Sequence, residues 1–116
     1  MLKEMEKAVK NVDRVKDWVR VHKTNFISDR HRKLNFDSLN TKMTDFCNNN
    51  KKLPVRISVY NYTNSGDHEL YGRVVTSVRE IEMRRGQNFE LINKRNKCMG
   101  HLFVADFKVN MKPFLL

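Results

Sequence analysis

The hydrophobic pattern near the N-terminus changes its period at Trp18. From residue 2 to residue 16, apolar side chains recur at the three- and four-residue spacing of an amphipathic helix: Leu2, Met5, Val9, Val12 and Val15. Beyond Trp18, β-branched and aromatic residues alternate with charged ones as far as Ile27, which is typical of a strand. The sequence therefore predicts a helix over residues 2–16 and a strand over about residues 18–27.

Alternating patterns continue through the rest of the chain. The clearest is Val55-Arg56-Ile57-Ser58-Val59, with Pro54 at its start, where a missing N–H is tolerated. Further strands are predicted over residues 34–38, 69–78, 89–92 and 101–110, and a helical turn or loop over residues 39–50. Short strands separated by polar turns indicate a mainly β fold, an antiparallel β-sandwich or a large part of one.

Charge limits the partners of the chain more than it limits the fold. The 116 residues, enough for one domain, hold 23 Lys plus Arg against 13 Asp plus Glu, a net charge of +10. Such an excess favours polyanions, either nucleic acid or an anionic membrane surface. No apolar run approaches the length of a bilayer-spanning segment, so membrane contact would be peripheral. Residues 1–10 lack the apolar core of a signal peptide, and we expect a cytoplasmic protein.

Between two predicted strands, residues 61–72 hold oxygen-bearing side chains of the kind that bind hard cations. Asn61, Thr63, Asp67 and Glu69 match several ligand positions of an EF-hand loop, but its closing bidentate Glu is replaced by Gly72. Strands rather than helices are predicted on both sides of the loop. We therefore reject an EF-hand.

The same stretch, from Val55 to Gly72, resembles the second C2 domain of copines, where two aspartates precede a Gly, a His followed by an acidic residue, and a closing Gly. Phe89-Glu90-Leu91-Ile92-Asn93-Lys94 is similar to the family's Phe-Glu-Leu-Ile-Asn-Pro-Lys segment. Gly100-His101-Leu102 through Leu116 is similar to the last C2 strand and the lead into the next domain. The strand at Val21-His22-Lys23-Thr24 resembles one that ends Tyr-Lys-Thr.

This resemblance implies a C2 module that binds calcium and phospholipid. It divides the chain into an N-terminal helical extension (1–17), a partial C2 domain (18–112) and the start of a linker to an A-type domain (113–116). Asn61 and Thr63 replace the family's two loop aspartates, leaving the carboxylates of Asp67 and Glu69. Calcium affinity falls with the number of charged ligands. We therefore expect a degenerate calcium loop with weak or no calcium binding.

The densest basic cluster lies on the strand after Trp18 and in the turn that follows it. Its members are Arg20, His22, Lys23, Arg30, Arg32 and Lys33. Such a cluster either binds anionic lipid headgroups or protects the edge of a sheet from pairing, and the two roles are compatible. A looser basic set at Arg84, Arg85, Lys94, Arg95 and Lys97 is assigned to solubility.

No catalytic constellation stands out, and we expect no enzymatic activity. The four histidines share no ligand spacing with one another or with Cys47 and Cys98. The leading hypothesis is peripheral, calcium-dependent phospholipid binding at the plasma membrane, with calcium dependence implied by the resemblance and weakened by the loop substitutions. The alternatives are a protein partner that pairs with uncovered strands and, with less support, nucleic acid, since no nucleic-acid-binding motif accompanies the charge.

Overall fold

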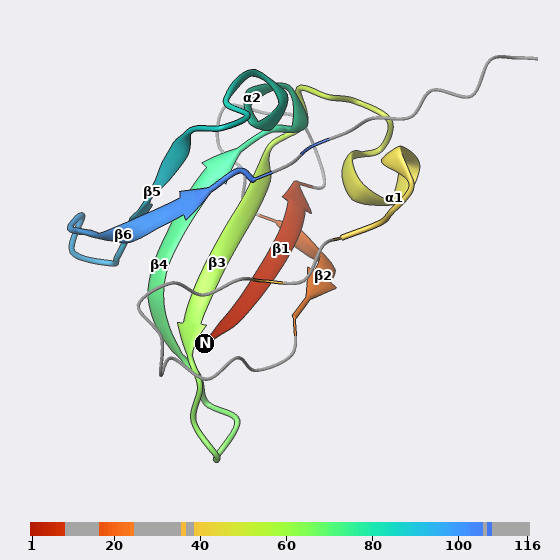
Figure 1. The fold of residues 1–116 in the computed structure, drawn as a ribbon. Helices are drawn as coiled ribbons and strands as arrows, with labels where there is room; N and C mark the ends of the chain where they lie inside the picture. The colour runs from red at the N-terminus through yellow and green to blue at the C-terminus, as the bar shows by residue number, and fades with distance from the viewer. Residues whose placement is uncertain (9–16, 25–35, 37–38, 106, 108–116) are drawn as a thin grey trace, which may run out of the picture.

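The computed structural model describes residues 1–8, 17–24, 36, 39–105 and 107. Six strands form one antiparallel sheet in the order β2-β1-β3-β4-β5-β6 (Figure 1). Their bounds are β1 Leu2–Ala8, β2 Trp18–Lys23, β3 Val55–Asn61, β4 Glu69–Thr76, β5 Asn88–Ile92 and β6 Cys98–Phe103. Two short helices, α1 Met43–Cys47 and α2 Val78–Met83, complete the described elements. The mainly β, antiparallel prediction is confirmed.

The N-terminal helix prediction is wrong for the residues that the structure describes. Leu2–Ala8 is strand β1, paired on one side with β2 and on the other with β3. Lys, Glu, Met and Ala are all good helix formers, but two neighbouring strands offer partners along both edges of this segment. Tertiary pairing therefore overrides local propensity. Residues 9–16 of the predicted helix lie outside the described residues.

The other predicted elements agree in part. The strand predicted from Trp18 is found as β2 up to Lys23, and the 54–78 hairpin is confirmed by the antiparallel pairing of β3 with β4. The strand predicted over residues 34–38 lies outside the described residues, apart from Phe36, which is not in a strand. The last strand begins earlier than predicted, at Cys98, and ends at Phe103.

Helix α2 was not predicted, because the strand prediction ran through Val78. Its start carries a recognisable signal: the Ser77 hydroxyl accepts a hydrogen bond from the Glu80 N–H at 3.2 Å, half of a capping box. Val78 and Ile81, three residues apart, are both buried. That spacing marks the buried face of a helix rather than the alternation of a strand.

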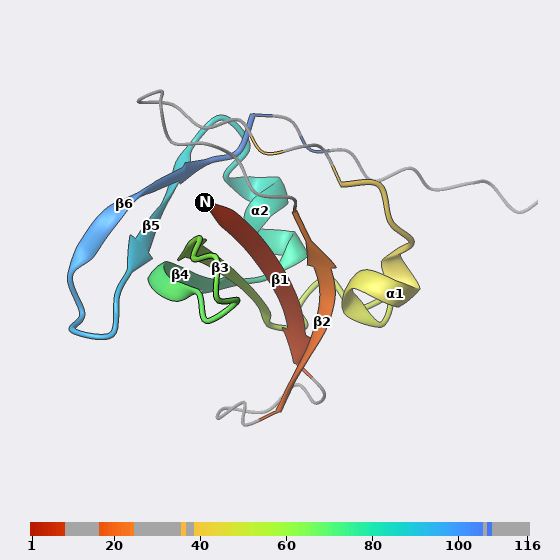
Figure 2. The same ribbon diagram turned by 90° about the horizontal axis from the view of Figure 1, so that it is seen from below.

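The sheet bends sharply between β4 and β5, where the ladder consists of the single pair Arg73↔Ile92. Seen from below, β5 and β6 lie at one side of the molecule and β1 and β2 at the other (Figure 2). Phe89 of β5 belongs to the same buried cluster as Met5 and Ile57, and Leu102 of β6 packs against it, so the β5–β6 hairpin contributes to the same core as the other strands. One continuous sheet thus contributes core residues from both of its ends.

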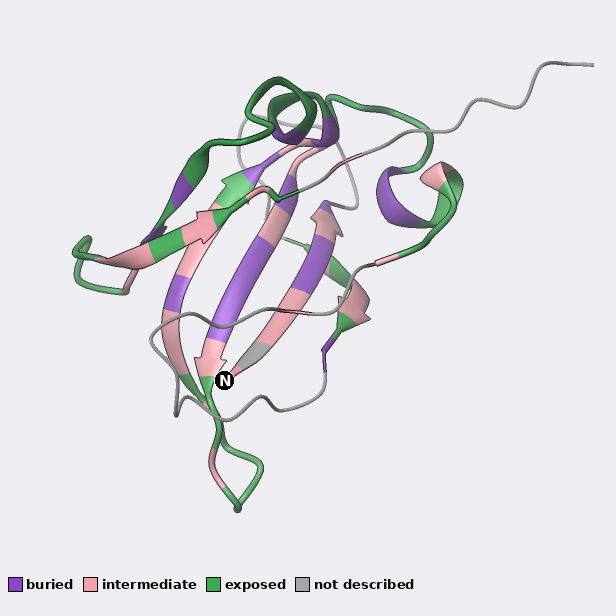
Figure 3. Cartoon of the chain, viewed as in Figure 1, coloured by how far each residue is buried: buried purple, intermediate pink, exposed green. Residues whose placement is uncertain are grey.

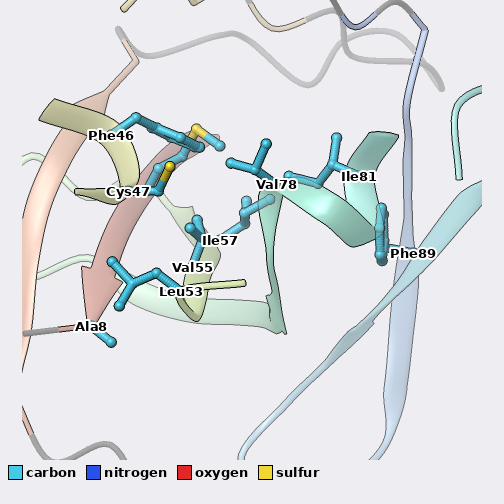
Figure 4. Close-up of a cluster of buried hydrophobic side chains, with 10 residues drawn as sticks. Ala8, Phe46, Cys47, Leu53, Val55, Ile57, Val78, Ile81 and Phe89 are labelled. Carbon is cyan, nitrogen blue, oxygen red and sulfur yellow. The ribbon is translucent and has the colours of Figure 1, made fainter. Parts of the chain in front are cut away.

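The core fills the space between this curved sheet and the two helices (Figure 4). Val55 and Ile57 project into it from β3, Phe46 and Cys47 from α1, and the α2 residues close its other end. In Figure 3 most of β3 is purple, because Val55, Ile57 and Val59 are buried in the core and Ser58 is buried on the other face. In the described part of the chain, no helix has the length and apolar character needed to cross a membrane.

Candidate functional site

The β3–β4 loop is a hairpin tip closed by its own hydrogen bonds. The ladder ends at the pair Asn61↔Glu69. The Thr63 hydroxyl donates to the Asp67 carbonyl oxygen at 2.8 Å, and the Thr63 N–H donates to Nδ1 of His68 at 3.1 Å. Gly66 has a φ of 86°, a conformation that favours glycine. The residues predicted as ligands are thus held in a compact polar turn.

The two rings beside this turn stabilise it further. Tyr62 stacks on His68 with the ring centroids 5.0 Å apart. The loop carboxylates of Asp67 and Glu69 are both exposed. Among the described residues, one group of three His, Cys, Asp or Glu side chains is close enough to share a metal ion. That group does not lie in this loop. The loop geometry supports a polar turn with two acidic side chains better than it supports a strong calcium site.

A bulge on β2 divides the predicted basic cluster between two faces of the sheet. His22 pairs with Met5 and Arg20 pairs with Glu6, so Val21 is an extra residue between them. Residues directly opposite each other share a face. Arg20 therefore lies on the Glu6 face, and His22 lies on the Met5 face. Lys23, opposite Glu4, returns to the same face as Arg20.

His22 differs chemically from its basic neighbours. Its Nε2 is buried and has no hydrogen-bond partner among the described residues. Burial lowers the pKa of its imidazole, and the nearby positive charge of Lys3 lowers it further. The lowered pKa favours the neutral form of the ring, so His22 adds less positive charge to the basic surface than Arg20 or Lys23. Arg30, Arg32 and Lys33 lie outside the described residues.

Sequence reasoning missed the polar contacts that organise the Arg20 face. The Arg56 guanidinium binds both carboxylate oxygens of Glu6, at 2.6 and 3.2 Å, and lies over the Trp18 ring at 4.6 Å. Arg73 donates from Nε to the Ser58 hydroxyl at 2.8 Å. The signal was present in β3, where Arg56 and Ser58 alternate with core residues.

These contacts decide which charges can meet a ligand. The charge of Arg56 is balanced by its buried partner Glu6. Arg20 is paired only loosely with Glu4, at 3.8 Å, and its side chain is 57% exposed. Lys23 is exposed as well. Arg73, on the same face, is half-buried against the Ser58 hydroxyl. Within the described part of the Arg20 face, the exposed positive charges are therefore those of Arg20 and Lys23, on the edge strand.

Comparison with known proteins identifies this arrangement of strands. The solved structure of BON1-C2B, a copine C2B domain, superposes with a TM-score of 0.71 over 92% of this chain and 74% of that chain, at 23% sequence identity. The chain therefore shares the fold of that C2 domain. No protein-family model matches the sequence.

The two candidate surfaces lie on different parts of the same sheet. The polar hairpin tip between β3 and β4 lies at one end of the sheet in Figure 1. The Arg20 face belongs to the β2-β1-β3 side of the same sheet. The domain boundaries and the site residues named from the sequence stay predictions.

Proposed function

We propose that this chain is a copine-like C2 module that docks peripherally on anionic phospholipid through Arg20 and Lys23, with little contribution from calcium. The observation that carries the proposal is the placement of these two exposed cations on one face of an edge strand in a C2 fold. Each basic residue near an anionic membrane contributes about 1 kcal/mol. The net charge of +10 adds a long-range attraction to the same surface.

Sedimentation with vesicles containing phosphatidylserine tests this docking surface. Reversing both charges, with Arg20→Glu and Lys23→Glu, removes at least about 2 kcal/mol, which corresponds to a roughly 30-fold loss of affinity. The matched control is Lys94→Glu with Lys97→Glu, which makes the same change in net charge on exposed residues of the β5–β6 turn. We expect the control to retain most of the binding in physiological salt.

Equal losses in the two double variants would show that net charge alone attracts the protein, and the docking surface would then be wrong. A mobility-shift assay with nucleic acid at the same ionic strength tests the alternative that the basic surface binds nucleic acid. Tighter binding to nucleic acid than to phosphatidylserine vesicles would replace the membrane proposal.

Isothermal titration calorimetry with calcium tests the expectation that calcium contributes little to docking. With two carboxylates in the loop, we expect no saturable calcium binding below roughly millimolar concentration, because calcium sites take six to eight oxygens, several of them anionic. Asn61→Asp with Thr63→Asp restores the charge and should tighten binding if the loop adopts the ligating geometry. Micromolar affinity in the unmodified protein would contradict the proposal.

Protein binding through uncovered strands is the second candidate function, because β2 and β6 are the two edges of the sheet formed by the described residues. On β2, however, the exposed Arg20 and Lys23 are side chains of the kind that discourage edge pairing. We therefore rank this function below membrane docking.

A further inference from the structure

A second cluster of metal-binding side chains lies on the β5–β6 hairpin, away from the β3–β4 loop. It consists of Glu90, Cys98 and His101, whose ligand atoms all lie within 4.8 Å of one another. All three side chains are exposed. Glu90 alternates along β5 with the buried residues Phe89 and Leu91, so the cluster occupies the outer face of the hairpin.

Strand register explains how these side chains come together. Glu90 pairs directly with His101 across the two strands, which places both on one face. Cys98 is three residues from His101, and in a regular strand that spacing points the two to opposite faces. Here Leu91 pairs with Gly100 and Ile92 with Cys98, so Met99 is an extra, bulged residue. The bulge turns Cys98 to the face of Glu90 and His101.

The bulge itself is held by contacts from two sides. The Tyr71 hydroxyl, from β4, donates to the Met99 carbonyl oxygen. In the adjoining turn, the side-chain Oδ1 of Asn93 accepts the Lys97 N–H at 3.0 Å, and the Asn93 N–H donates to the Lys97 carbonyl oxygen at 3.0 Å. Cys98 therefore follows a turn whose geometry is fixed by hydrogen bonds, which orients a ligand before the ion arrives.

The kinds of ligand atom in this cluster determine which metal it suits. Thiolate, imidazole and carboxylate together suit zinc, whereas calcium and magnesium take oxygen ligands. Tetrahedral zinc with its usual bond lengths separates ligand atoms by about 3.3–3.8 Å. The ligand atoms therefore have to close by about 1 Å from their present separation of up to 4.8 Å, and the exposure of all three side chains leaves them room to rotate.

We propose that Glu90, Cys98 and His101 bind one zinc ion, with a fourth position open to water. Because Glu90 comes from β5 and the other two ligands from β6, the ion cross-links the hairpin. This hairpin joins the rest of the sheet through the single pair Arg73↔Ile92, so such a cross-link would stiffen the most weakly attached part of the sheet. An ion that binds only the folded chain raises its stability by mass action.

Isothermal titration of the reduced, chelator-treated full chain with zinc chloride tests the site. We expect one ion per chain and at least a tenfold loss of affinity in each of Cys98→Ser, His101→Asn and Glu90→Gln. Glu82→Gln is the matched control, because Glu82 is an exposed carboxylate that forms an ion pair with the exposed Lys51. The control should bind zinc as the unmodified chain does, and calcium chloride should give no heat at this site.

Cobalt provides a spectroscopic reading of the same ligands. A thiolate-to-cobalt charge-transfer band should appear on titration with cobalt chloride and disappear in Cys98→Ser. Alkylation of the folded protein should reach the exposed Cys98, spare the buried Cys47 and abolish the band. Thermal melts without metal check that every variant folds. Zinc binding that survives in all three ligand variants, or no saturable zinc binding by the folded unmodified chain, would overturn the proposal.

Discussion

The ion pair between Glu6 and Arg56 joins two central strands and anchors the edge strand beside them. Two hydrogen bonds link the side chains, which are only 10% and 20% exposed. Arg56 also lies over Trp18 of β2. We predict that Arg56→Met lowers the free energy of unfolding by about 2–4 kcal/mol, because it leaves the Glu6 carboxylate buried without its partner. Loss of the cation–π contact contributes about 0.5–1 kcal/mol of this.

A double-mutant cycle separates the pair from its surroundings. Glu6→Gln keeps the shape of the side chain and removes its charge, so adding it to Arg56→Met should recover part of the lost stability. We expect a coupling energy of about 1–3 kcal/mol between the two positions. Urea unfolding followed by far-ultraviolet circular dichroism measures it. Fluorescence of Trp18, the only tryptophan, reports on the same contact.

The control is Lys51→Met, which breaks the ion pair with Glu82 between side chains that are 43% and 49% exposed. Exposed pairs contribute little, so this change should cost no more than about 0.5 kcal/mol. If Arg56→Met costs no more than Lys51→Met, the pair is not a structural anchor. Arg56 would then be free to act in binding, and the ranking of charges on the Arg20 face would have to change.

Three further changes test other parts of the fold. Gly72→Ala would place a Cβ 2.7 Å from Cβ of Leu91, at the bend of the sheet, and should lower the melting temperature through an overpacking cost of about 1–3 kcal/mol; an unchanged melting temperature would contradict the close approach. Ser77→Ala removes the cap on the Glu80 N–H and should cost about 1 kcal/mol in urea unfolding, where a cost near zero would count against the cap. Because the pKa of His22 is lowered in the folded state, its contribution to stability is present above its unfolded value near 6.5 and is lost as the pH falls. The melting temperature of the unmodified protein should therefore fall more steeply than that of His22→Asn between pH 7.5 and pH 5, and parallel profiles would exclude this role.

The strands that could be predicted from the sequence are those in which every residue on the core-facing side is apolar. In β3, Val55, Ile57 and Val59 are all buried, and the alternation in the sequence is the alternation in the structure. In β1, by contrast, Lys3 and Lys7 occupy the inward register positions on either side of Met5, so the strand shows no apolar stripe. Its conformation comes from pairing with residues far along the chain, which no local pattern records.

The candidate sites were harder to predict than the strands, because extra residues in the ladders decide which side chains share a face. Alternation alone groups Arg20 with His22, yet the bulge at Val21 separates them. Alternation likewise separates Cys98 from His101, yet the bulge at Met99 brings them together. A sequence pattern with a period of two carries no signal for a single inserted residue.

A third bulge links the other features of the β5–β6 region. Val59 pairs with Gly72 and Tyr60 with Leu70, so Tyr71 is the extra residue of β4. Its hydroxyl binds the carbonyl oxygen of Met99, the extra residue of β6. The next residue, Gly72, lets Leu91 approach the β4 backbone closely. The regular ladder between β4 and β5 has one pair, and the contact between the two bulged residues Tyr71 and Met99 adds a second link beside it. The position of the hairpin, and the geometry of the proposed zinc ligands on it, therefore depend on this contact. This contact explains how a hairpin with so little regular pairing keeps a defined place over the core.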